Sequence, residues 1–224
     1  MLEKRTIKVK GIGHAKATPD CIVLSLSLRA ANKAYTKATL IGAQQLEMLQ
    51  ESLEEVGFLS DDLKTTKFSV DAKYETEERC ENGRTVYHNV FVEFECLHEL
   101  KLSFDMDQEK LREAVEAISH CLSQPKISIA FTIKDIAAMR DEIMRTAALD
   151  AQRKARILCE ASGVKLGELL NINYSWDEVE ITHFLEAPMY CGSADSVGEI
   201  PQYNFTPDDV EAGDNVSFLW EIED

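Results

Sequence analysis

The sequence predicts an α+β fold, with a mixed, largely antiparallel sheet, three helices packed on one face of it, and a long β-hairpin. The first observation behind this class is a repeated unit of alternating strand, amphipathic helix, Gly-plus-hydrophobic helix stop and second alternating strand. Its two copies cover 22–72 and 127–174. The second is Asn82-Gly83, which suits a two-residue hairpin turn because both positions need positive φ. We expect the chain, 1–224, to form one domain.

Each element is predicted from the periodicity of its hydrophobic residues and from the residues that begin and end it. Strands alternate apolar and polar residues, and helices repeat apolar residues at steps of three and four. Asn32, Asp107 and Asp135 are expected helix N-caps, and Gly57-Phe58 and Gly163-Val164 are expected stops. In chain order, the expected elements are strands over 6–13 and 21–29, a helix over 33–56, a hairpin arm over about 63–104, helices over 108–121 and 136–161 around a strand over 126–134, and strands over 168–176 and 216–222.

The hairpin is the longest expected element. Apolar residues keep to even positions from Val86 to Phe104, which predicts a strand, or two strands in line, reaching roughly 60 Å at ~3.3 Å per residue. Typical strands are about a third as long. We therefore interpret the hairpin as a contact arm. The candidate contact residues on it are Tyr74, Arg84, Tyr87 and Phe91.

A long loop is expected over about 186–214, where Pro, Gly and Ser residues collect. Loops of this length are usually functional or disordered. Tyr190 and Tyr203 are the candidate contact residues here. An alternative hypothesis makes the protein a small-ligand binder, with this loop as a lid that carries Tyr190, Tyr203 and Phe205.

The composition of the chain disfavours some classes of binding partner. The formal net charge of −16 repels phosphate backbones and anionic membranes, so we expect neither nucleic acid nor membrane binding. No apolar run reaches the ~20 residues of a membrane helix, and the N-terminus enters a strand directly. The six cysteines form no Cys-x-x-Cys pair, which favours buried free thiols. We therefore expect a cytoplasmic protein.

The motifs that could carry chemistry have structural explanations. Gly11-Ile12-Gly13 precedes a strand rather than a helix, which favours a bend or bulge over a phosphate loop. His88 and His98 fall in the apolar register of the hairpin, as half-buried core or interface residues. His183 lies between Glu180 and Glu186, but its neighbours favour an extended segment over a metal-binding helix face.

An acidic cluster and one cysteine are two further candidates for chemistry. The acidic cluster lacks the oxygen spacing of a calcium loop and is interpreted as a solvated turn near a short helix start; its members are Asp208, Asp209, Glu211 and Asp214. Cys80 is the most exposed-looking thiol, and a redox role for it stays open. We expect no catalytic residue, metal or cofactor. A hydrolase that uses His183 or the acidic cluster is the weakest hypothesis, because no nucleophile–base spacing is visible.

Several pieces, taken in order, resemble the SIMPL-domain family, a bacterial group with periplasmic immunogenic and oxidative-stress-associated members and animal relatives described as partners of an interleukin-receptor-associated kinase. The resemblance covers nearly the whole chain. The matching pieces are Ile7–Gly13 followed by Pro19-Asp20, the helix segment Ala147–Ala155, Gly163–Gly167 and the closing strand after Pro207. It implies a mixed α+β fold, a tendency to form ring-like or higher homo-oligomers and a link to stress, but no catalytic residue. We therefore expect a non-enzymatic protein that acts through homo-oligomerisation or contacts with a protein partner.

Overall fold

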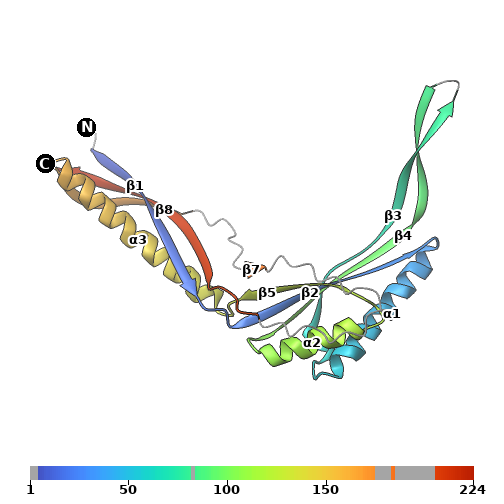
Figure 1. The fold of residues 1–224 in the computed structure, drawn as a ribbon. Coiled ribbons are helices and arrows are strands. Elements are labelled where there is room, and N and C mark those ends of the chain that lie inside the picture. Colours follow the sequence, from blue (N-terminus) through green and yellow to red (C-terminus); the bar gives the residue numbers. More distant parts are fainter. Residues whose placement is uncertain (1–4, 82–83, 175–182, 185–204) are drawn as a thin grey trace. The chain divides into compact units, whose positions relative to one another are not determined.

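The computed structural model describes residues 5–81, 84–174, 183–184 and 205–224, which form two compact units. The α+β class is confirmed, with the strands in two antiparallel sheets (Figure 1). One unit holds β1 (Thr6–Ala17), α3 (Ile136–Ala161), β6 (Lys165–Asn173) and β8 (Val210–Glu223). The other holds β2 (Cys21–Asn32), α1 (Tyr35–Glu54), the 3-10 turn η1 (Ser60–Asp62), β3 (Leu63–Glu81), β4 (Arg84–Asp105), α2 (Gln108–His120) and most of β5 (Lys126–Thr132).

The first unit is a three-stranded sheet in the order β1-β8-β6, with α3 across one face. β1 and β8 pair without interruption from Thr6 opposite Glu221 to Ala17 opposite Val210. Because side chains alternate along a strand, every second residue of both strands faces the helix. The core between them combines small helix residues with large sheet residues, namely Val9, Ala147, Ala151, Ala155, Val216, Phe218 and Trp220.

The helix and the first strand are in backbone contact, which explains both glycines of β1. A Cβ atom on Gly11 would lie 2.0 Å from the carbonyl oxygen of Ala147, and one on Gly13 would lie 1.9 Å from that of Ile143. No other residue type fits at either position. The expected bend or bulge at these glycines is therefore wrong, because β1 runs straight through them. The glycines serve close approach instead.

Side chains of α3 also cap the outer edge of β1. The Ile12 N–H donates to Asp150 Oδ2 at 2.9 Å, and the His14 N–H donates to Thr146 Oγ1 at 3.1 Å. Lys154 Nζ donates to the Lys10 carbonyl at 3.4 Å. The Lys154 side chain, the Ile12 N–H and a neighbouring arginine hold the pKa of Asp150 well below its ordinary value. These bonds occupy the middle of the outer edge of β1, from Lys10 to His14, and block pairing of a further strand there.

The other outer strand of this sheet, β6, is irregular. Its pairing with β8 shifts register on both sides of Leu169, and such bulges bend an edge away from new partners. Leu169, Leu170 and Ile172 are exposed.

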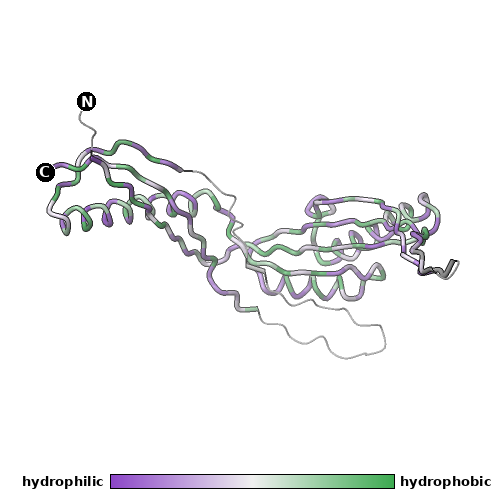
Figure 2. Tube along the Cα trace, turned by 90° about the horizontal axis from the view of Figure 1, so that it is seen from above, coloured by the Kyte–Doolittle hydropathy of each residue, from purple (hydrophilic) through white to green (hydrophobic). Residues whose placement is uncertain are grey.

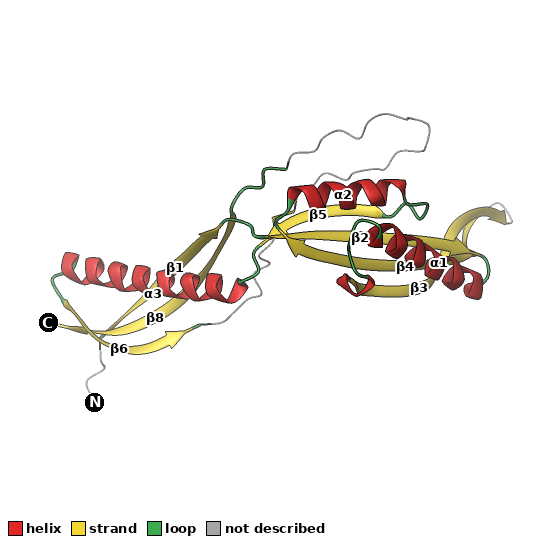
Figure 3. Cartoon of the chain, turned by 90° about the horizontal axis from the view of Figure 1, so that it is seen from below, coloured by secondary structure: helices red, strands yellow, loops and turns green. Residues whose placement is uncertain are grey.

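The second unit is a sheet in the order β3-β4-β2-β5-β7, where β7 is His183–Phe184, and α1 and α2 cover one face of it (Figure 3). The predicted one-faced strand is confirmed in β2, whose alternate residues Ile22, Leu24, Leu26 and Leu28 are almost fully buried. Along the tube in Figure 2, hydrophobic and hydrophilic residues alternate through the strands and helices of both units. This alternation is the pattern from which the elements were predicted.

Both predicted glycine stops are confirmed. Gly57 has φ of 87° and Gly163 has φ of 71°, the left-handed conformation that glycine adopts without strain. The N–H of the following hydrophobic residue then bonds back into each helix, from Phe58 to Leu53 and from Val164 to Cys159.

Two of the three predicted helix N-caps are confirmed. Asp107 and Asp135 cap α2 and α3 as expected, each accepting backbone N–H bonds from the first turn. Asn32 instead accepts the N–H of Ala34, and α1 begins at Tyr35 with Ala34 as its N-cap. The expected cap at Asn32 is therefore two residues early.

His98 lies in the core of the second unit, as its register indicated. It is 7% exposed, and its Nε2 lies 2.8 Å from Thr65 Oγ1. Its ring and that of Phe68 pack edge to face, with their centroids 5.3 Å apart. Burial lowers the pKa of this imidazole below its usual value of 6.5.

Replacing Gly13 by Ala should lower the free energy of unfolding by about 1–3 kcal/mol, the usual cost of overpacking. The new methyl group would collide with the Ile143 carbonyl. At an unconstrained strand position the same change stabilises the protein by about 0.5–1 kcal/mol. The sign of the change in the free energy of unfolding therefore shows whether the position is constrained. Chemical denaturation followed by circular dichroism measures the difference. Thr6→Ala, on an exposed position of β1, is the control. A Gly13→Ala protein as stable as the wild type would contradict the close approach.

The stability of the protein should depend on the charge of His98. Because its folded pKa is lowered, the unfolded chain binds more protons below pH 6.5. The stability contributed by the neutral imidazole is therefore present above that pH and is lost as the pH falls. Denaturation at about pH 7.5 and about pH 5.5 should show a smaller loss for His98→Gln than for the wild type. The exposed His120→Gln is the control and should follow the wild type; equal losses in all three proteins would refute the assignment.

Candidate interaction surface on the hairpin

The predicted contact arm is a continuous two-stranded hairpin. β3 and β4 pair from Leu63 opposite Leu102 to Glu81 opposite Arg84, and the far end of this ribbon runs past the start of α1 (Figure 1). The turn residues Asn82 and Gly83 lie outside the described residues. Since the helices cover only the near half of the hairpin, the side chains of the far half have no core to enter.

A β-bulge corrects the predicted register of β4. Lys73 pairs with Glu93, but the next residue, Tyr74, pairs with Phe91, so Val92 is the extra residue. His88 and Val90 therefore face away from the side that the even residues from Phe94 onward share. A single alternation from 86 to 104 is wrong, because one extra residue exchanges the faces. The exchange brings Phe91 onto the face of Phe94.

The bulge assembles an aromatic patch, which we define as Tyr35, Tyr74, Tyr87, Phe91 and Phe94. The ring centroids of Tyr74 and Phe91 are 5.9 Å apart, those of Phe91 and Phe94 are 5.0 Å apart, and those of Phe94 and Tyr35 are 5.6 Å apart. Tyr35 is the first residue of α1, so the patch lies on the face that carries the helix. Tyr87 is four residues from Phe91 and shares its face.

The patch is open to solvent. The exposed fractions are 51% for Tyr35, 59% for Tyr74, 63% for Tyr87 and 39% for Phe91. Aromatic side chains of this size are usually buried, and clusters of them on a surface mark contact sites.

The structure brings together three of the six predicted contact residues, Tyr74, Tyr87 and Phe91. Arg84 begins β4, but its side chain, like that of Cys80, lies outside the described residues. Tyr190 and Tyr203 lie outside them as well. Sequence reasoning missed Tyr35 and Phe94: the first starts a helix and the second belongs to the core register, so neither signals an exposed patch.

The far half of the hairpin is acidic. The segment 75–81 contains four Glu residues and one Arg. Glu75 and Glu78 are exposed, and neither has an ion-pair partner within the described ranges. Glu78 is paired with Tyr87 across the hairpin, which places a carboxylate on the aromatic face.

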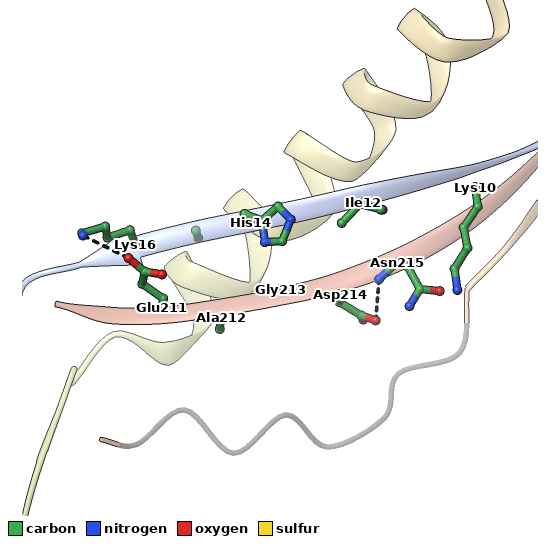
Figure 4. Close-up of a pocket in the computed structure, with 10 residues that line it drawn as sticks. Lys10, Ile12, His14, Lys16, Glu211, Ala212, Gly213, Asp214 and Asn215 are labelled. Carbon is green, nitrogen blue, oxygen red and sulfur yellow. Dashed lines mark hydrogen bonds and ion pairs between the residues drawn. The ribbon is translucent and has the colours of Figure 1, made fainter. Parts of the chain in front are cut away.

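A second surface lies in the other unit, on the face of β1 and β8 that α3 leaves open (Figure 4). It is a hollow of about 700 Å³ in which Lys10, Ile12 and His14 of β1 lie beside Gly213 and Asn215 of β8. Gly213 leaves room for the imidazole of His14, because a Cβ there would lie 2.7 Å from Nδ1.

The acidic cluster helps to close one end of this hollow. Lys16 Nζ lies 3.0 Å from Glu211 Oε1 and 3.4 Å from Asp209 Oδ2, and these carboxylates raise the pKa of the lysine. Glu211 and Asp214 belong to β8, so the expected solvated turn is wrong for them, and the short helix start expected at Asp208 or Asp209 is wrong because β8 follows directly. Strand pairing with β1 extends β8 back to Val210, into the last residues of the predicted loop.

The lid hypothesis falls mostly on residues that are not described. Residues 185–204 lie outside the described part of the chain. Phe205 is described, and its carbonyl accepts a bond from Gln108 Nε2 at 2.9 Å. This bond ties the chain at Phe205 to the start of α2.

Comparison with known proteins assigns the family. The family model of SIMPL, described as a protein of unknown function (DUF541), matches residues 7–218. The chain belongs to the SIMPL family. A search of curated proteins gives no match for this SIMPL protein. No helix in the described residues is both long and apolar enough to cross a membrane.

The exposed tyrosines should be dispensable for folding. Replacing both Tyr74 and Tyr87 by Ser should change the free energy of unfolding by less than about 1 kcal/mol, because only two exposed cross-strand pairs, with Phe91 and Glu78, are lost. Phe94→Ala should cost more, since Phe94 is half-buried and contacts both Phe91 and Tyr35. Thermal and chemical unfolding measure both effects. A large loss in the tyrosine variant would mean that the aromatic patch supports the fold rather than a contact.

Proposed function

We propose that this SIMPL protein is a non-enzymatic assembly protein, whose hairpin associates with a second copy of the chain through the aromatic patch. The observation that carries the proposal is the set of exposed rings on a paired arm. Tyr74 and Tyr87, both more than half exposed, lie on one face of the hairpin with Phe91, and the equally exposed Tyr35 of α1 adjoins this face through Phe94.

The energetics favour a contact. Tyrosine and other aromatic residues dominate the binding energy of interfaces, because they bury large rigid surfaces at low entropic cost. Three of the exposed rings are partly ordered in advance by ring contacts: Tyr74 packs on Phe91, and Phe91 and Tyr35 each pack on Phe94. A partner that covers them therefore orders few further side chains.

The non-enzymatic part of the proposal is consistent with the placement of His98. The hydroxyl of Thr65 lies within hydrogen-bond distance of its imidazole, a pairing that active sites use to activate a nucleophile. Here the imidazole is buried against Phe68 and faces the core. A packing role accounts for the pair.

Cytoplasmic location is part of the same proposal. Four of the six cysteines have described side chains, Cys21, Cys96, Cys121 and Cys159; these are free thiols, and all but Cys21 are buried. Free thiols in the core suit a reducing compartment. A role in stress is the physiological setting that the family resemblance suggests.

Native mass spectrometry and light scattering at tens of micromolar protein test the proposal. The wild type should form assemblies larger than one chain. The double variant Tyr74→Ser with Tyr87→Ser, and a variant lacking residues 76–86, should shift toward the monomer, because the apolar area that the contact buries is lost.

Leu59→Ser is the matched control, since Leu59 is 70% exposed but lies away from the patch, beside η1. It should assemble like the wild type. A wild type that stays strictly monomeric would refute the proposal, and so would a tyrosine variant that assembles as well as the control.

A further inference from the structure

We propose that the hairpin of one copy docks on the open face of β1 and β8 of another copy. The inference rests on the proposed function and names the surface that receives the aromatic patch. Two observations carry it: the charge of β1 is opposite to that of the hairpin, and the hollow on this face has an exposed apolar centre.

The open face of β1 is basic in a strongly acidic chain. Between Thr6 and Ala17 the sequence contains three Lys residues and His14 but no Asp or Glu, while the chain as a whole carries a net charge of −16. The three lysines, Lys8, Lys10 and Lys16, are two or more residues apart in even register and so share the face opposite α3.

Two of these lysines are uncompensated. Lys16 is engaged by Glu211 and Asp209. Lys8 and Lys10 are exposed, and within the described part of the chain neither ammonium group has an ion-pair partner. They are about 7 Å apart along the strand, the spacing of side chains on one face of any extended segment. An acidic segment matches them in sign.

The hairpin of a second copy is such a segment. Its far half contains four Glu residues against one Arg in 75–81, and Glu78, which shares the face of the aromatic patch, is exposed. Two copies that each carry −16 repel each other at long range, so approach is favoured only where local charges are opposite. The basic face of β1 and the acidic hairpin provide that orientation.

The hollow supplies the apolar part of the contact. Ile12 is 46% exposed at its centre, between Lys10 and His14 (Figure 4). A tyrosine ring of the hairpin that covers Ile12 would bury both side chains, with the Lys10 ammonium at the ring face. Contacts between a cation and a ring contribute about 0.5–2 kcal/mol, depending on exposure.

The docking site and the hairpin are different surfaces of one chain, so the contact is heterologous. Each copy then offers both a hairpin and a β1 face, so association closes as a reciprocal dimer or a ring, or continues as a filament.

Charge reversal on each surface tests the docking site, with the full chain followed by native mass spectrometry and sedimentation. The face variant combines Lys8→Glu with Lys10→Glu, and the hairpin variant is Glu78→Lys, on the face of the aromatic patch. Each alone should associate at least about tenfold more weakly, because like charges then meet across the contact. An equimolar mixture should regain assembly, since each variant hairpin meets a face of opposite charge.

The matched control for the face variant combines Lys64→Glu with Lys101→Glu. These two exposed lysines pair across β3 and β4, and their reversal changes the net charge by the same amount as the face variant does. It should assemble like the wild type. Circular dichroism confirms that every variant is folded.

The outcomes separate the two proposals. If the wild type and the control assemble and the tyrosine variant does not, but the face variant also assembles, the docking site is overturned and the proposed function stands. Failure of the mixture to assemble likewise overturns the docking site. A wild type that stays monomeric at every concentration overturns both.

Discussion

The close approach of α3 to β1 is the constraint on which the first unit depends. Gly11 and Gly13 admit the helix backbone, and Ala147 and Ala151 present almost no side chain to the strand. With the helix this near, Thr146, Asp150 and Lys154 reach the edge of β1 and satisfy its backbone groups. The same contact thus builds the core, protects an edge from unwanted pairing and leaves only one face of β1 exposed.

In the second unit the corresponding constraint is a single extra residue. Val92 shifts the register of β4, and the shift moves Phe91 to the face of Phe94 and Tyr35. Without it the aromatic rings would be divided between the two faces of the hairpin. The core residues from Cys96 to Leu102 keep their alternation on the other side of the bulge. One strand therefore serves the core along one half and a solvent-exposed surface along the other.

Much of the fold was predictable because its signals are local. Helix stops of this kind need a residue in the left-handed conformation, so Gly57 and Gly163 mark the helix ends in the sequence. Asp107 and Asp135 mark helix starts, because each accepts bonds from N–H groups at most three residues away. The candidate contact site was predictable in part. Tyr74, Tyr87 and Phe91 stand out on a long polar hairpin, whereas Tyr35 joins them only because α1 begins beside β4.

By itself the sequence determined the α+β class, the order of the elements, the helix boundaries at glycine and the long hairpin. These depend on periodicity and on backbone preferences within a few residues. Only the tertiary structure decided why Gly11 and Gly13 are glycines, which face Phe91 occupies and which acids engage Lys16. Each of those depends on atoms brought together from segments far apart in the chain, or on a register that one residue can shift, and neither leaves a periodic trace in the sequence.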